Sequence, residues 1–275
     1  MKIYHYKNSF REGLILHKKG QWAEVAPLPG WSQETLSEAL DQLRCPRGPL
    51  YPSVAFALEM LEAPPLEKPV SVPVSAFFMG SPEQIMERAG KAEQNGFTTA
   101  KVKIGHLGPN EAFEVVSALK DKFRLRIDIN RKWELKRTLD FFDLFAGDAF
   151  DYIEEPVQNP EDLVHFKHPI ALDEFFHFPF PRAKALVFKP TLRGGPSSFP
   201  KTELPCIVGG AFESGIGIYQ IARLVPLLGL PDLPIGVDTY SYLEEDLLET
   251  PLVFSGGRVH LPLAIHPNME LLHAL

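Results

Sequence analysis

The chain has 275 residues, enough to bury a large core as one barrel-sized domain or as a large domain beside a smaller one. Its formal net charge of −7, without clustered Lys and Arg, argues against a nucleic-acid partner. No apolar run approaches the roughly 20 residues of a membrane span, and residues 1–11 are polar and charged throughout, so we expect no membrane segment, no signal peptide and a cytoplasmic location.

The first 66 residues predict an α+β unit. Alternating segments near Tyr4, at Leu14–Leu16 and at Trp22–Val25 are typical of antiparallel strands. Helical periodicity follows over residues 33–43 and 54–61. We expect the first of these helices to start at Ser32, just after a Pro-Gly pair.

From about Val72 to about residue 250, short apolar runs alternate with amphipathic stretches. Repeated β-then-α units predict parallel strands with helical crossovers, and seven or eight of them favour an α/β barrel over a doubly wound sheet. Strands are expected at Val72–Phe78, Ala100–Ile104, Leu125–Ile129, Tyr152–Ile153, Ile170–Leu172, Leu186–Phe188 and Cys206–Val208. Helices are expected at Ser81–Asn95, Glu111–Lys122, Leu135–Phe145, Glu161–Phe166 and Ile216–Leu228. From about Pro251, a tail with a strand at Arg258–Leu261 is expected to pack back on the first unit.

Charged residues follow five successive strands of the predicted barrel, where such a fold holds its active site. A single Asp or Lys at a strand end is usually solvated or caps a helix, but five in order are hard to attribute to chance. These residues are Lys101 and Lys103, Asp128, Glu154, Asp173 and Lys189.

The three carboxylates of this set predict a cation site. Asp128, Glu154 and Asp173 are hard oxygen donors that suit Mg²⁺, with Mn²⁺ as an alternative ion. Lys103 and Lys189 would flank that site and offset its charge. A metal on a substrate carboxylate would stabilise an enediolate, and a lysine with a lowered pKa could remove the α-proton.

A glycine-rich segment, Gly209–Gly217, precedes the last predicted helix but lacks the ending of a phosphate-binding P-loop. We interpret Gly209, Gly210, Glu213 and Ser214 as part of a backbone cradle for a substrate carboxylate. A tight turn that needs small residues explains the glycines equally well.

Eight motifs together resemble the o-succinylbenzoate synthase family, in the muconate-lactonizing-type branch of the enolase superfamily. The motifs are Ala26–Thr35, Tyr51–Phe56, Lys101–Gly105, Arg126–Trp133, Ile153–Pro156, Ala171–Glu174, Phe188–Leu192 and Gly236–Thr239. The resemblance implies a modified (β/α)7β TIM-like barrel over residues 72–250. It also implies an α+β capping domain built from residues 1–71 and completed by residues 251–275.

The resemblance also implies a reaction and residue roles. The family dehydrates 2-succinyl-6-hydroxy-2,4-cyclohexadiene-1-carboxylate to o-succinylbenzoate, by syn β-elimination, on the way to menaquinone. Lys103 would then be the base and acid, Lys189 the opposing positive charge, and the three carboxylates the Mg²⁺ ligands. Further support is implied for Lys101, Arg126 and Asn130, and substrate contact for Pro29 and Gly30 in the capping loop. The chain departs from the family pattern at Gly209 and Gly210, where the family has two serines.

Two other functions remain open. A dipeptide epimerase, N-succinylamino acid racemase or muconate-cycloisomerase-like enzyme would use the same lysines and carboxylates. A non-catalytic barrel that binds a partner is less favoured, because all of those residues are present. The expected partner is therefore a small carboxylate, with no nucleic acid and no membrane, and a monomer is compatible with the sequence.

Overall fold

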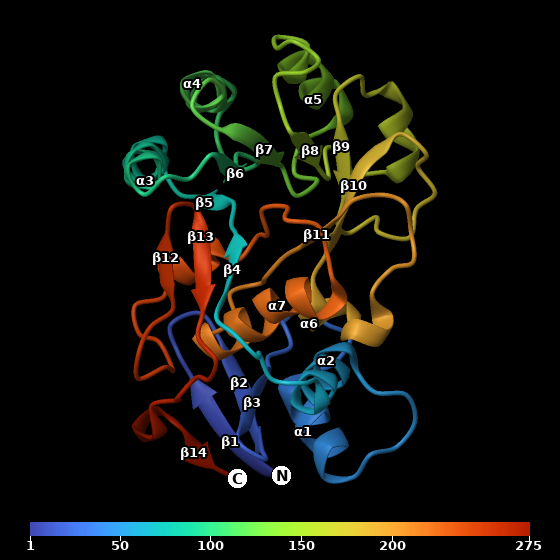
Figure 1. The fold of residues 1–275 in the computed structure, drawn as a ribbon. Coiled ribbons are helices and arrows are strands. Elements are labelled where there is room, and N and C mark those ends of the chain that lie inside the picture. Colours follow the sequence, from blue (N-terminus) through green and yellow to red (C-terminus); the bar gives the residue numbers. More distant parts are fainter.

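The computed structural model describes residues 1–275 and contains three sheets. Figure 1 shows a seven-stranded parallel sheet with its helices in the upper half, and a four-stranded antiparallel sheet with both chain termini in the lower half. A three-stranded sheet lies at one side, between the two. The predicted combination of an α/β barrel with an α+β unit is confirmed.

The lower unit is built as its alternating pattern predicts. Its sheet has the order β14-β1-β2-β3, and the apolar faces of β2 and β3 are buried against two helices. The first helix starts at Thr35 instead of Ser32, because Thr35 and Glu38 form a capping box, whereas the Ser32 hydroxyl accepts from the Leu28 N–H. The elements are β1 (Lys2–Lys7), β2 (Glu12–Lys18), β3 (Gln21–Val25), α1 (Leu36–Arg44), α2 (Pro52–Glu62) and β14 (His273–Ala274).

The upper sheet curls into a barrel. Its strands are β5 (Ala76–Phe78), β6 (Thr99–Lys103), β7 (Arg124–Asp128), β8 (Tyr152–Glu154), β9 (Ile170–Leu172), β10 (Ala183–Phe188) and β11 (Cys206–Val208). Two isolated parallel bridges join Val74 to Ile235 and Gly209 to Gly236. Residues 235 and 236 therefore close the barrel between β11 and β5 without forming a full eighth strand.

The outer layer of the barrel is irregular. Four longer helices are present, α3 (Pro82–Gln94), α4 (Pro109–Leu119), α5 (Leu135–Phe142) and α7 (Gly215–Leu228), with the four-residue α6 (Pro190–Arg193). The predicted helix at Glu161–Phe166 is a 3₁₀ helix, η1 (Pro160–His165), and β9 connects to β10 without a helix. These short connections leave no room for full α-helical crossovers. The other 3₁₀ turns are η2 (Pro196–Ser198), η3 (Asp238–Tyr242) and η4 (Met269–Leu271).

The predicted strand at Val72–Phe78 is two strands in different sheets. β4 (Val70–Pro73) pairs with β13 (Arg258–Leu261), which also pairs with β12 (Val253–Ser255). After Pro73, the Val74 and Ser75 N–H groups bond to carbonyls of residues 257 and 235, so the chain crosses to the barrel. The tail packs back on the first unit, as predicted, because β14 pairs with β1. The domain limits at residues 72 and 251 stay predictions.

Helix α7 joins the two halves of the molecule. It lies between the barrel and the lower sheet (Figure 1), and residues 215–225 are all buried. The buried carboxylate of Glu24 on β3 accepts hydrogen bonds from the Tyr6 hydroxyl at 2.6 Å, the Gly217 N–H at 2.9 Å and the Ser214 N–H at 3.1 Å. Glu24 thus caps the first turn of α7 from the other unit. The N–H groups of that turn have no acceptor within the helix and therefore favour a carboxylate. A Cβ at Gly217 would lie 2.6 Å from that carboxylate.

We expect Glu24→Ala to lower the free energy of unfolding by about 3 kcal/mol, because several buried donors lose their acceptor together. Urea unfolding followed by circular dichroism measures the change. Glu12→Ala is the control, since Glu12 forms an exposed pair with His5 on the same sheet. A loss for Glu24→Ala no larger than that of the control would show that Glu24 does not hold the two units together.

Candidate active site

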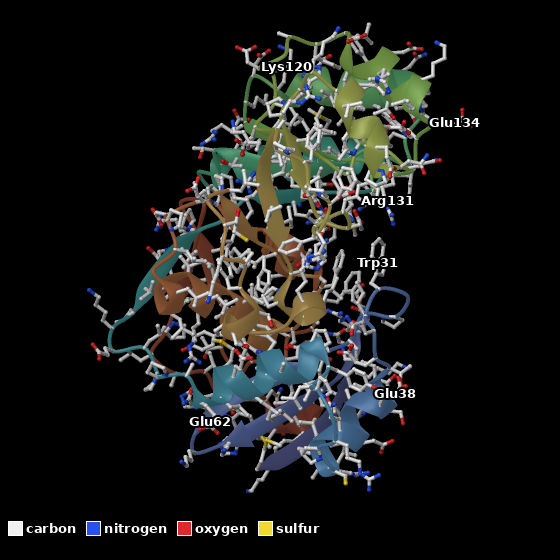
Figure 2. The ribbon with its side chains drawn as sticks, turned by 90° about the vertical axis from the view of Figure 1, so that its right-hand side faces the viewer. Trp31, Glu38, Glu62, Lys120, Arg131 and Glu134 are labelled. Atoms are coloured by element: carbon white, nitrogen blue, oxygen red, sulfur yellow. The ribbon has the colours of Figure 1, made fainter.

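A cavity of about 420 Å³ lies at the mouth of the barrel, between the two units. Leu28 and Trp31 line it from the first unit, and Figure 2 shows Trp31 on a loop between the halves, facing the barrel segment that carries Arg131. Eight of the residues predicted for the site line this cavity. They are Lys101, Lys103, Arg126, Asn130, Glu154, Lys189, Gly209 and Gly210.

Strand register brings the first charged residues together. Lys103 on β6 pairs with Asp128 on β7, and Asp128 with Glu154 on β8, so the three lie in one row across neighbouring strands. Lys101 Nζ lies 2.5 Å from Glu154 Oε1 and 2.9 Å from Asp128 Oδ2. Lys103 Nζ is farther away, 3.9 Å from Asp128 Oδ2. The Lys101 ammonium therefore bridges two of the three predicted metal ligands.

The third predicted ligand has a different partner. Asp173 forms an ion pair with Lys189, and Arg193 Nη2 lies 3.7 Å from Asp173 Oδ1. No group of three His, Cys, Asp or Glu side chains in the chain is arranged to hold a metal ion. The three carboxylates thus do not form a ready metal site in this structure, in which each of them contacts a lysine ammonium group.

The lysines of the site differ in their surroundings. Burial lowers the pKa of Lys103, and the positive charges of Lys101 and Lys189 act in the same direction, although Asp128 opposes them. Burial would also lower the pKa of Lys189, but the Asp173 carboxylate outweighs it and the pKa is raised. The pKa of Lys101 is likewise raised well above its ordinary value, because Asp128 and Glu154 outweigh its burial. Lys103 is thus the lysine of this set that gives up its proton most easily.

Buried negative charge exceeds what these lysines neutralise. Burial, with repulsion from Asp128 and Asp173, raises the pKa of Glu154 to about 7. Burial and the neighbouring Glu174 raise the pKa of Glu155 to about 8. Both carboxylate oxygens of Glu174, which lines the cavity, lack a hydrogen-bond partner. A set of hard oxygen donors with a deficit of positive charge fits a divalent cation such as Mg²⁺.

Several predicted supporting residues have other partners. Arg126 donates to Asp151 at 2.9 Å and to the Pro234 carbonyl at 2.7 Å, so its guanidinium is held in the barrel wall. The Asn130 N–H donates to Asp128 Oδ1 at 2.9 Å and thus helps to orient that carboxylate. Pro29 and Gly30 are exposed and do not line the cavity, whereas their neighbours Leu28 and Trp31 do.

The glycine-rich segment forms a wall of the cavity. The Gly209 N–H bonds to the Phe188 carbonyl at 2.9 Å and the Gly210 N–H to the Gly236 carbonyl at 2.8 Å. The Ser214 N–H bonds to Glu24. These three N–H groups are therefore engaged with the protein itself in this structure, and the carboxylate cradle stays a prediction. The tight-turn interpretation fits, because a Cβ at Gly210 would lie 2.9 Å from the Glu213 carboxylate.

Glu213 stabilises the glycine-rich segment that lines the cavity. Its carboxylate accepts from the Thr191 hydroxyl at 2.7 Å and from the Ala211 N–H, and lies 3.4 Å from Arg11 Nη1. Arg11 is buried, comes from the turn between β1 and β2, and also donates to the Ala211 carbonyl. The wall and the segment after Lys189 are thus tied to the first unit. Arg11 was missed because nothing near it in the sequence resembles a motif.

Aromatic side chains form another part of the cavity that sequence reasoning missed. Phe77 on β5 and Phe212 line it with their ring centroids 6.0 Å apart in an edge-to-face pair. Phe10 of the first unit stacks on Phe212 at 5.3 Å. Phe212 adopts a left-handed backbone conformation with φ of 65°, which turns its ring into the cavity wall. In the sequence, the position of Phe212 next to the glycine-rich segment was the feature that could have indicated it as a site residue.

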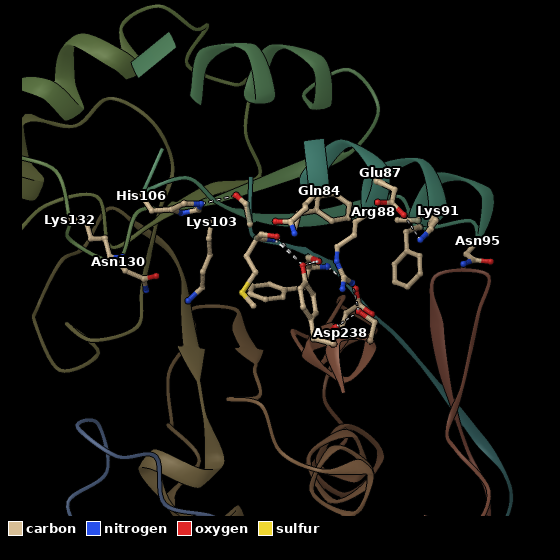
Figure 3. Close-up of a pocket in the computed structure, with 18 residues that line it drawn as sticks. Gln84, Glu87, Arg88, Lys91, Asn95, Lys103, His106, Asn130, Lys132 and Asp238 are labelled. Atoms are coloured by element: carbon tan, nitrogen blue, oxygen red, sulfur yellow. Dashed lines mark hydrogen bonds and ion pairs between the residues drawn. The ribbon is translucent and has the colours of Figure 1, made fainter. Parts of the chain in front are cut away.

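A larger cavity of about 930 Å³ opens beside the first and shares Phe77, Lys103, Asn130 and Lys132 with it. Figure 3 shows Lys103 extending into it, with Lys132 and Asn130 on one side and Arg88 on the other. Glu154 and Glu174 line the smaller cavity but not the larger one, so the chemistry is assigned to the smaller cavity. Buried Asp238 also lines the larger one, where its carboxylate accepts from the Phe77 N–H at 2.8 Å.

Comparisons with known proteins identify relatives of this chain. Residues 84–186 match the family model described as enolase C-terminal domain-like. The o-succinylbenzoate synthase of Haemophilus influenzae is 29% identical over 284 residues, covering 86% of this chain and 85% of the relative.

Two solved structures share the fold. The o-succinylbenzoate synthase of Thermosynechococcus elongatus, complexed with magnesium in its active site, has a TM-score of 0.68 and 23% identity, covering 89% of each chain. A substrate-liganded L-Ala-D/L-Glu epimerase from Bacillus subtilis has a TM-score of 0.73 and 18% identity, covering 96% of this chain and 94% of its own. Separately, none of the helices combines the length and the apolar character needed to cross a bilayer.

Asp238 predicts a pH dependence of stability. Burial raises its pKa to about 7 in the folded chain, so the folded state favours the neutral carboxyl. That contribution, up to about 4 kcal/mol, is fully present below the unfolded pKa and is lost as the pH rises from about 4 through 7. We expect Asp238→Asn to be less sensitive than wild type to a change from pH 5 to pH 8, as measured by urea unfolding. Parallel pH profiles for the two proteins would contradict this.

Proposed function

Because the chain belongs to the enolase superfamily, we propose that it is an o-succinylbenzoate synthase, a lyase of menaquinone biosynthesis. The observation that carries the proposal is the cavity at the barrel mouth, where Lys103 on β6 and Lys189 just after β10 flank Glu154 on β8, the strand midway between them in the sheet. Relatives of that name match along most of the chain. The resemblance read from the motifs is thereby confirmed.

The proposed reaction removes water from 2-succinyl-6-hydroxy-2,4-cyclohexadiene-1-carboxylate. Lys103, as a neutral amine, takes the proton from the carbon next to the ring carboxylate. It then returns a proton to the hydroxyl group as the carbon–oxygen bond breaks on the same face, so that water leaves and the ring becomes aromatic. Lys189 stays an ammonium ion and stabilises the negative charge from the opposite side.

The metal belongs to this proposal. Asp128, Glu154 and Asp173 would hold Mg²⁺, which supplies positive charge for the ring carboxylate and for the enediolate form of the substrate. Mn²⁺ would suit the same oxygen donors. Lys101, which now bridges Asp128 and Glu154, would lose part of that contact when the ion binds.

Location and oligomeric state are part of the proposed function. We infer a cytoplasmic enzyme that works as a monomer on a small carboxylate. Cys45 and Cys206 are free thiols, which suits a reducing compartment.

The main alternative is an epimerase, racemase or cycloisomerase on the same scaffold, since proton removal next to a carboxylate starts each of these reactions. The L-Ala-D/L-Glu epimerase has the same fold, which is compatible with this alternative. Purified protein with Mg²⁺ and the cyclohexadiene substrate should give the absorbance change of an aromatic product. Epimerisation of dipeptides, with no dehydration, would favour the alternative.

We expect Lys103→Met and Lys189→Met each to lower kcat by about 10³-fold or more, since each removes a group acting in the transition state. Rates of o-succinylbenzoate formation measure this. Lys184→Met, on the outward face of β10, is the matched control and should keep the wild-type rate. Circular dichroism should show that all three variants are folded. A near-normal rate for Lys103→Met would remove Lys103 from its role.

Removing the metal should stop the reaction and lower the stability. We expect a chelator to abolish turnover and Mg²⁺ to restore it. Mg²⁺ should also raise the Tm of wild type but not of Asp173→Asn, because binding to the folded state alone stabilises it. Full turnover after exhaustive chelation, or equal Tm shifts in both proteins, would contradict the assignment of the site.

A further inference from the structure

The proposed substrate carries a second carboxylate, at the end of its succinyl group, and this charge needs a partner in the site. The ring carboxylate is accounted for by the cation site. The backbone N–H groups of Gly209, Gly210 and Ser214 already bond to protein acceptors. A cationic side chain that lines the cavity and has no partner of its own would supply the opposite charge.

Most cationic side chains lining the cavity have partners. Lys101 bridges Asp128 and Glu154, Lys189 pairs with Asp173, and Arg126 is bonded to Asp151 and a backbone carbonyl. Lys103 is needed for proton transfer. Lys132 lines the cavity, and its ammonium group forms neither an ion pair nor a hydrogen bond in this structure.

The backbone around Lys132 holds it in place. Asn130 and Arg131 both have left-handed conformations, with φ of 49° and 56°, and the Arg131 N–H bonds to the Glu155 carbonyl at 3.1 Å. On the other side, the Trp133 ring is buried and its Nε1 donates to the Gly105 carbonyl at 3.1 Å. Lys132 therefore projects from a fixed turn, while its own side chain is exposed.

Lys132 also stands where the two cavities meet, since it lines both, together with Lys103, Asn130 and Phe77. The other cations of the larger cavity are engaged. Arg88 stacks on the Tyr242 ring at 3.4 Å and Lys91 pairs with Glu87 at 2.7 Å. Lys132 is thus a lysine without an ion pair or hydrogen bond that lines both cavities.

We propose that Lys132 binds the distal carboxylate of the substrate and that the succinyl group lies in the passage shared by the two cavities. A lysine suits this task, because it is a flexible point charge that can follow a flexible chain. The inference rests on the proposed function and adds to it a residue that selects substrates with an anionic tail.

The test compares Lys132→Met with Lys136→Met, a control that removes an exposed lysine on the adjacent helix α5. The probes are o-succinylbenzoate and its analogue with a primary amide in place of the succinyl carboxylate, bound to the Mg²⁺-loaded enzyme in a calorimeter. We expect wild type and Lys136→Met to prefer the acid by about 10- to 100-fold, as a charge-assisted hydrogen bond implies, and Lys132→Met to lose that preference. For the substrate itself, Lys132→Met should raise KM while kcat stays within about threefold, because the contact is equal in ground and transition states.

Lys132→Arg should keep most of the preference, because it keeps the charge. An unchanged preference in Lys132→Met, or a fall in kcat with unchanged KM, would overturn the inference. The proposed function can fail separately. In one such outcome, wild type shows no dehydratase turnover but still prefers the acid, with Lys132→Met losing that preference. This result would refute the synthase activity and support the carboxylate site at Lys132. Failure of wild type to distinguish the two probes would refute the Lys132 site.

Discussion

The compensation of buried charge at the barrel mouth controls the rest of the site. Parallel strands bring their carboxyl ends to one edge, and in this chain those ends carry acidic and basic side chains that are withdrawn from water. A buried carboxylate without a partner is costly, so the lysines lie against the carboxylates. The same arrangement prepares the site for a divalent ion, which would release ammonium groups now used as counterions. Charge balance thus connects the fold to the chemistry.

A second constraint is the junction between the two units, which meet at buried polar contacts as well as apolar ones. Glu24 caps helix α7, and Arg11 lies 3.4 Å from the Glu213 carboxylate. These contacts surround the wall that carries Gly209 and Phe212. The first unit therefore helps to fix the shape of the cavity, in addition to supplying Leu28 and Trp31. Substitutions in the lower sheet should therefore alter the shape of the active-site cavity through this junction.

Much of this architecture could be predicted from sequence, and the exceptions have physical causes. Strand ends such as Lys103 and Asp128 could be placed because alternation and parallel pairing fix which side chains share a face. The split at Pro73 was missed because one apolar run serves two sheets, which only tertiary contacts reveal. The hydrogen bonds of the Gly210 and Ser214 N–H groups could not be foreseen, because their acceptors, the Gly236 carbonyl and Glu24, are remote in sequence. The partner of Arg126, Asp151, likewise lies just before the neighbouring strand β8, which spacing alone does not identify.

If the site works as proposed, Asp128, Glu154 and Asp173 exchange their lysine counterions for one divalent cation. The most direct test is a crystal structure of the protein with Mn²⁺, using the anomalous signal of the metal to locate it. The account predicts a single strong peak bonded to oxygen atoms of all three carboxylates, with the Lys101 ammonium withdrawn from its bridge. A bridge that stays intact, with the ion elsewhere or not bound at all, would contradict it.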